Sequence, residues 1–143
     1  MTTVTDIMDS MDYGPAPEGA SIVTDWLGQS AEGFGHFIGG AFSGPGLTFE
    51  VQAPASGSVL ARVTQGTPED VVAAVGAART ALPAWAALSG HEQARHLYAL
   101  ARHVQQHSRF LAVLESLDNS KPIPESRDVD VPLVTWQFYH HAD

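Results

Sequence analysis

The sequence predicts a β-hairpin and a short strand followed by three or four α-helices, and two observations indicate this order. Between Phe34 and Val63, apolar and polar residues alternate and turns rich in glycine or proline recur, as is typical of short strands. From Thr67 onward, apolar residues recur every three or four positions, which is the period of an α-helix. The change of period therefore separates a β region, residues 34–66, from a helical region, residues 67–143.

An N-terminal extension precedes these two regions. Residues 1–20 are acidic, lack an apolar period and contain Pro15 and Pro17, so we expect an extended connector there. The segment from Ser21 to Gly28 predicts a short helix that stops at the glycine. We assign residues 1–33 to this extension.

The β region is expected to hold three strands. Residues 34–44 alternate roughly, and residues 47–51 form a cleaner strand. Gly44-Pro45-Gly46 lies between them and predicts the turn of a hairpin. A second turn then leads to a third short strand at residues 59–63.

Two clear signals start the helical region. Thr67 is a favourable N-cap and Pro68 suits the first helical position, whereas Pro83 should bend or end this helix. Ser89 begins a second helix, because Glu92 stands three residues later as a capping box requires. The expected apolar face of the first helix consists of Val71, Ala74, Val75, Ala78, Leu82 and Trp85.

Two further helices are expected. Ser108 is the expected cap of the third helix, which ends near Ser120. The last helix begins near Pro124, and Pro132 should kink it because that residue cannot donate to the carbonyl of Asp128.

Composition excludes several classes of protein. The 143 residues carry a formal charge of −9, which disfavours binding to nucleic acid. Cysteine is absent, so this chain offers no disulfide, thiolate zinc site or cysteine nucleophile. No apolar run is long enough for a membrane span, and the N-terminus does not resemble a signal peptide. We therefore expect no membrane partner and a cytoplasmic location.

Two groups of residues are candidates for metal binding. His103 and His107 lie four residues apart on a predicted helix and can share a metal, but a solvated helix face explains them more simply. Asp118 lies at the end of the third helix, where the helix dipole disfavours a carboxylate unless a nearby cation compensates its charge. Lys121 or a bound metal cation could supply that charge, and turn chemistry alone is a further reading.

Five segments together carry a family resemblance. They are Ala53–Val59, Glu69–Trp85, Arg95–Val104, Leu114–Glu125 and Asp130–Ala142. In this order and spacing they resemble the N-terminal portion of an aldehyde dehydrogenase. The segment from Met8 to Leu27 is most similar to the N-terminal extension of the family-16 aldehyde dehydrogenases.

This resemblance implies an α/β fold overall and an enzyme that oxidises aldehydes to carboxylic acids with NAD or NADP. The family works through a cysteine nucleophile, a glutamate base and dinucleotide-binding βαβ units, and none of these can be named in this chain. We therefore expect the N-terminal part of an enzyme, inactive alone, whose partners are the aldehyde, the remainder of the enzyme chain and a second copy in a homodimer. The alternative is a stand-alone helical interaction module derived from such an enzyme, since aromatic residues crowd positions 136–139.

The resemblance also implies site residues. It implies no catalytic or cofactor-binding residue in this chain, and it places Val129, Leu133 and Trp136 along the substrate tunnel. It implies a structural monovalent cation held by Asp118 and by a backbone carbonyl near Gln52. The chain departs from the family pattern at Ala53, where Asn is usual, and at Ser120, where Gly is usual.

Overall fold

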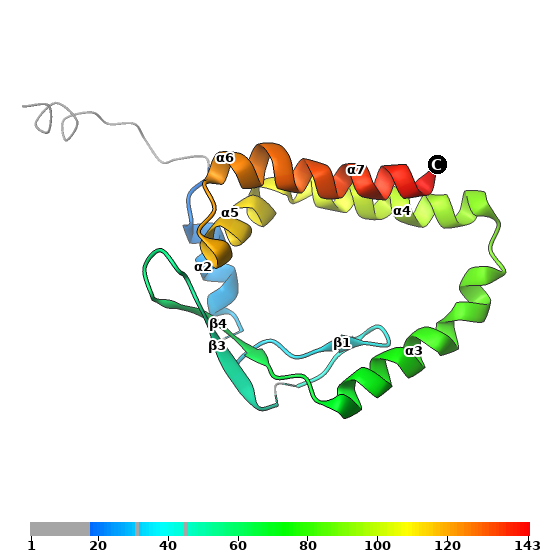
Figure 1. Ribbon diagram of the computed structural model, residues 1–143, viewed down its shortest axis with the longest axis horizontal. Coiled ribbons are helices and arrows are strands. Elements are labelled where there is room, and N and C mark those ends of the chain that lie inside the picture. Colours follow the sequence, from blue (N-terminus) through cyan, green and yellow to red (C-terminus); the bar gives the residue numbers. More distant parts are fainter. Residues whose placement is uncertain (1–17, 31, 45) are drawn as a thin grey trace, which may run out of the picture.

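The helices and strands are arranged as a ring (Figure 1). The computed structural model describes residues 18–30, 32–44 and 46–143. The elements in chain order are α2 (Ser21–Gly28), β1 (Phe37–Ile38), β2 (Ala41–Phe42), β3 (Thr48–Gln52), β4 (Val59–Thr64), α3 (Pro68–Ala86), α4 (Gly90–Gln106), α5 (Ser108–Asn119), α6 (Ile123–Glu125), the π-helix η1 (Ser126–Asp130) and α7 (Val131–Ala142). A strand region followed by helices is thus confirmed, as is the short helix that ends at Gly28.

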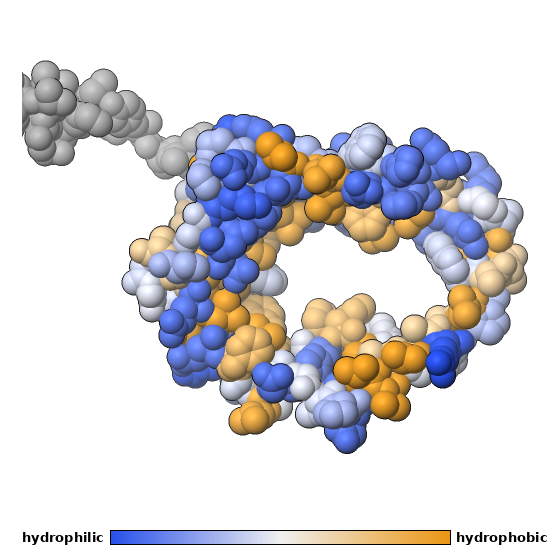
Figure 2. All heavy atoms as spheres, in the orientation of Figure 1, coloured by the Kyte–Doolittle hydropathy of each residue, from blue (hydrophilic) through white to orange (hydrophobic). Residues whose placement is uncertain are grey.

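The long helices form two sides of this ring. α4 and α7 lie side by side along one edge, and α3 runs along the opposite edge next to β1 (Figure 1). The β3–β4 hairpin, α2 and α5 close one end. Figure 2 shows an opening through the middle of the molecule, with hydrophobic residues along parts of its edge.

The strands form two separate antiparallel hairpins, which corrects the sequence-based prediction. The first hairpin pairs Phe37 with Phe42 and turns at Gly39 and Gly40. Both glycines have positive φ angles, 62° and 87°, the backbone conformation that a two-residue hairpin turn requires. The hairpin predicted across Gly44-Pro45-Gly46 is therefore wrong, because the chain already reverses within residues 34–44.

The second hairpin joins β3 to β4, so the third predicted strand pairs with the second. Thr48 opposes Thr64, and a β-bulge shifts the register between Val51 and Gln52. The connecting turn is closed by the Ala53 N–H, which donates to the Ser58 carbonyl at 2.8 Å. This turn carries the end of β3 toward the end of α5.

Both predicted helix starts are confirmed as complete capping boxes. The Thr67 N–H donates to Asp70 Oδ2 at 2.9 Å, and the Asp70 N–H donates back to Thr67 Oγ1 at 3.2 Å. Ser89 and Glu92 make the same reciprocal pair at the start of α4. Side chains thereby satisfy donors that have no partner within a helix.

One other helix prediction needs correction, and one agrees with the structure. Ser108 is the first residue of α5 and not its cap, because His107 occupies the cap position and no side chain caps that helix. Pro83 lies within α3, which continues to Ala86. The helix thus ends within one turn of the proline, as expected, and Pro83 cannot donate to the Arg79 carbonyl four residues back.

The apolar face of α3 is not buried. Among the described residues, no side chain of this helix falls in the buried class. The exposed large residues of this helix are Val71, Val72, Val75, Leu82 and Trp85. An amphipathic helix is ordinarily stabilised by packing of that face, so α3 presents surface that a partner could cover.

The core lies where α2, the β3–β4 hairpin and α5 meet. Val23 is fully buried and packs in one cluster with Leu27 and Val113. The Trp26 ring stacks on Phe34 with centroids 5.2 Å apart and meets Phe110 edge-on at 5.3 Å. These contacts fix the N-terminal extension onto the helical region.

The last helix contains a π-helical turn at η1, which ends two residues before Pro132. The Val131 N–H at its end donates to the Ser126 carbonyl, five residues back. The distortion expected at Pro132 therefore takes the form of a widened turn, and the proline itself lies in the first turn of α7. A missing N–H is tolerated at that position.

Acidification should weaken the first turns of α3 and α4. Hydrogen bonds from the Thr67 backbone and side chain hold the pKa of Asp70 below its usual value, and the Ser89 side chain and backbone lower the pKa of Glu92 likewise. A lowered folded-state pKa stabilises the fold above the unfolded-state pKa of about 4, and this contribution is lost as the pH falls through the folded-state pKa. We expect the helical circular dichroism signal to fall between roughly pH 5 and pH 2.

The double variant Asp70→Asn, Glu92→Gln should lose this part of the pH dependence. Glu69→Gln is the matched control, because Glu69 lies in the same first turn but takes no part in the capping box. If the double variant and the wild type gave superimposable pH profiles, the capping carboxylates would not be responsible.

Candidate functional site

One apolar cavity lies between the β3–β4 hairpin, α2 and α5. Its volume is about 630 Å³, and apolar side chains from these elements and from α7 line it. The carboxylates of Glu115 and Asp118 add charge at the α5 side, and Val51 lines it from β3. The structure therefore brings the end of β3 and the end of α5 to one hollow.

Asp118 is exposed, and Lys121 does not pair with it. The Lys121 ammonium instead donates to Asp130 at 2.6 Å and to Glu115 at 3.3 Å. The proposed Asp118–Lys121 pair is thus wrong, since the chain turns after Ser120 and carries Lys121 toward η1. This leaves the Asp118 carboxylate available at the cavity.

Lys121 ties α5 to the π-helical turn. Hydrogen bonding to Asp130, aided by Glu115, raises the pKa of Lys121 above its usual value against the opposing effect of desolvation. Ser116 and Ser126 join the same two elements through their hydroxyls at 3.2 Å, and Ser126 is fully buried. The junction after α5 is therefore held by an ion-pair network.

The turn after α5 contains a strained residue. Ser120 has φ 59° and ψ 21°, the left-handed conformation that glycine adopts without steric cost. Its N–H donates to the Ser116 carbonyl at 3.0 Å. The family departure at Ser120 therefore falls where the backbone favours glycine.

Gln52 lies at the end of β3, beside the bulge. It pairs with Val59, and the next residue, Ala53, is buried with 4% of its surface exposed. In the described part of the chain, no group of three or more His, Asp or Glu side chains could hold a metal ion. A cation beside Asp118 would therefore need backbone oxygens, which are ligands that hard cations accept.

The three expected tunnel residues lie along the outer face of η1 and α7. Val129, Leu133 and Trp136 are 57%, 49% and 58% exposed. Val131 and Thr135 are buried instead, since α7 packs on α4 and α5. The stripe predicted from the sequence is a surface that the described residues leave uncovered.

Sequence reasoning missed the ion pairs of Arg127 with two carboxylates. Arg127 donates to both oxygens of Asp128 and to Glu18 at 3.1 Å, which links the extension to η1. These bonds raise the pKa of Arg127 and lower that of Asp128. Glu18 stands 109 residues away in the chain, so no local pattern could have indicated this contact.

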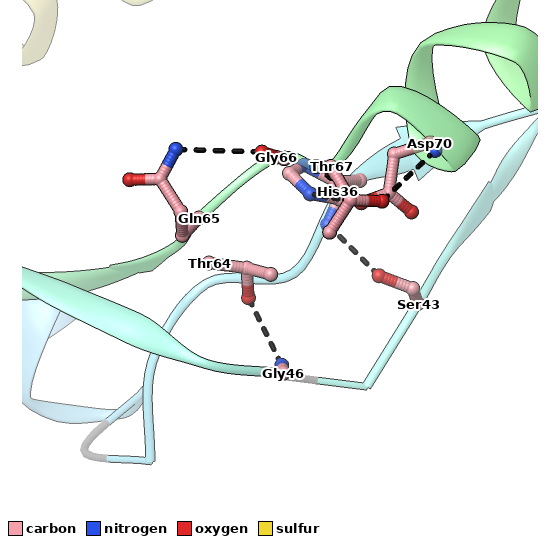
Figure 3. A network of polar contacts seen from close by, with 8 residues as sticks. All are labelled: His36, Ser43, Gly46, Thr64, Gln65, Gly66, Thr67 and Asp70. Carbon is pink, nitrogen blue, oxygen red and sulfur yellow. Dashed lines mark hydrogen bonds and ion pairs between the residues drawn. The ribbon is translucent and has the colours of Figure 1, made fainter.

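A second missed contact joins the first hairpin to α3. His36 Nε2 lies 3.5 Å from Asp70 Oδ2, and the two side chains point toward one another (Figure 3). The backbone N–H of His36 donates to Ser43 Oγ at 2.9 Å. The capping carboxylate of α3 thus also faces the hairpin.

None of the helices in the described part of the chain combines the length and hydropathy needed to cross a bilayer.

Comparison with known proteins identifies the family. The model of the family described as "Aldehyde dehydrogenase family" matches residues 43–143. Acetaldehyde dehydrogenase 2 of Cupriavidus necator is 38% identical over 109 residues, which are 75% of this chain and 22% of that protein. The mitochondrial aldehyde dehydrogenase family 2 member B4 of Arabidopsis thaliana is 38% identical over 110 residues, covering 76% and 20%.

Solved structures agree with these relatives. The NAD⁺ complex of the aldehyde dehydrogenase from Bacillus cereus matches with a TM-score of 0.78 and 34% identity, over 92% of this chain and 26% of that one. The chain spans about a fifth of the length of the curated relatives that it matches.

Replacing Ser120 by glycine should stabilise the fold by about 0.5–1 kcal/mol, because glycine adopts the left-handed conformation without a steric penalty. The free energy of unfolding in urea measures this change. Ser120→Ala is the control, because alanine keeps the penalty and loses the hydroxyl. A glycine variant no more stable than the alanine variant would contradict the strain at this position.

Proposed function

This chain belongs to the aldehyde dehydrogenase family, and we propose that it forms the N-terminal part of an NAD(P)-dependent enzyme that oxidises aldehydes to carboxylic acids. The observation that carries this proposal is the family match over residues 43–143, together with relatives of which the match covers only about a fifth. This chain contains no cysteine to serve as the nucleophile. We propose that it has no activity alone.

The uncovered apolar surfaces support a structural role within a larger enzyme. α3 exposes one apolar face, and η1 and α7 expose another. A contiguous exposed apolar surface ordinarily marks a site of contact with other protein. We propose that the remainder of the enzyme covers both faces.

Finer assignments rest on the resemblance. The N-terminal extension supports membership of the family-16 branch, although residues 1–17 lie outside the described residues. Use of NAD or NADP, a homodimeric assembly and a cytoplasmic location are proposed on the same basis. An NAD⁺ complex of a relative supports NAD in particular.

Two site assignments belong to this proposal. Val129, Leu133 and Trp136 would line the substrate tunnel, and their exposure on one face supports contact with another part of the enzyme. Asp118 and the carbonyl of Gln52 would hold a structural monovalent cation. Support comes from the Asp118 carboxylate, which does not pair with Lys121 and lies in one cavity with Val51.

The function is tested on the intact product of the gene. Its coding sequence beyond codon 143 is read, and the whole protein is assayed with aldehydes and NAD⁺ or NADP⁺ by the absorbance of the reduced cofactor. We expect turnover by the intact protein and none by the 143-residue chain. A coding sequence that stopped at this codon would instead favour the interaction module, and turnover by the chain alone would refute its proposed role.

The cation is tested by thermal unfolding of the intact enzyme. Added Na⁺ or K⁺ should raise its melting temperature at constant ionic strength, because a cation bound only by the folded state stabilises it. Asp118→Asn should abolish this rise, whereas Asp25→Asn on α2 should retain it. A rise that persisted in Asp118→Asn would remove Asp118 from the cation site.

A further inference from the structure

His103 and His107 occupy successive turns on one side of the chain at the end of α4. The His107 N–H donates to the His103 carbonyl at 3.1 Å, so the two residues stand in the helical i, i+4 relation. Their imidazole planes are within 5° of parallel, with centroids 6.4 Å apart. Both residues are exposed. Two side chains so related can turn their ring nitrogens toward a common point beside the helix.

The hollow beside the two histidines contains no positively charged side chain that would repel a metal ion. Both histidines border a hollow of about 500 Å³ whose other lining residues are Trp26, Val104, Phe110 and Leu111, none of which carries a charge. A positive ion beside the two rings therefore meets no opposing cation among the residues that line this hollow.

We propose that His103 and His107 form a two-imidazole site for a divalent transition-metal ion. Imidazole nitrogen suits copper, zinc and nickel, and Cu²⁺ binds such ligands most tightly of the common divalent ions. No group of three or more His, Asp or Glu side chains that could hold a metal occurs in the described residues, so water completes the coordination. The site is separate from the proposed oxidation of aldehydes and does not depend on it.

The two histidines in the last turn of α7 cannot form a site of this kind. His140 and His141 are adjacent, their rings are tilted by 56°, and successive residues of a helix point about 100° apart. One helix therefore cannot direct both rings at a single ion. These two histidines serve as the matched control.

Trp26 provides the signal for the test because it borders the same hollow. In a Trp85→Phe, Trp136→Phe background Trp26 is the remaining tryptophan, and Cu²⁺ is titrated into the full 143-residue chain while its fluorescence is followed. We expect saturable quenching. His103→Ala or His107→Ala should weaken copper binding at least about ten-fold, because the second imidazole binds within the same molecule. Mg²⁺, which prefers oxygen ligands, should cause no quenching.

The control variant His140→Ala, His141→Ala should bind copper at this site as tightly as the background protein. A second measurement guards against misfolded variants: Cu²⁺ should raise the melting temperature of the wild type but not that of His103→Ala, His107→Ala. The proposal is overturned if the single variants weaken quenching no more than the control does, or if copper shifts the melting temperature of the double variant as much as that of the wild type.

Discussion

The packing of Trp26 between Phe34 and Phe110 is the interaction on which the rest of the structure depends. It joins three segments that are distant in sequence, namely the N-terminal extension, the β region and the helical region. The buried cluster around Val23 lies at the same junction. Aromatic rings bury much surface and prefer the stacked and edge-on geometries seen here. The relative position of these segments is therefore set at one end of the ring.

Away from this junction the molecule is held by fewer contacts. α4 and α7 pack along their length, but α3 reaches the rest through the first hairpin and its two ends. Large apolar side chains consequently remain at the surface of α3 and α7. These uncovered faces are the surfaces that we propose the remainder of a longer enzyme to cover.

Local chemistry could be predicted from the sequence, and contacts between distant residues could not. The helix starts at Thr67 and Ser89 depend on side chains three residues apart, so the printed sequence contains the whole signal. The pattern of residues 34–44 conceals the first hairpin because rough alternation continues across Gly39-Gly40, although two adjacent glycines suit a tight turn. The same difference between local and long-range signals applies to the candidate site. The position of Asp118 at a helix end was predictable. That Lys121 pairs with Glu115 and Asp130 and not with Asp118 was not, because it depends on where η1 lies.

The π-helical turn at Ser126–Asp130 sets the register of α7. A π-turn holds one more residue than the α-helical turn that it replaces, so it absorbs a single-residue insertion without displacing the next helix. Val131 and Thr135 keep their inward direction in α7, while Leu133 and Trp136 keep theirs outward. The extra residue in this turn therefore determines which side chains of α7 face the core. Removing it without restoring a π-turn would rotate every later side chain of the helix by about 100°.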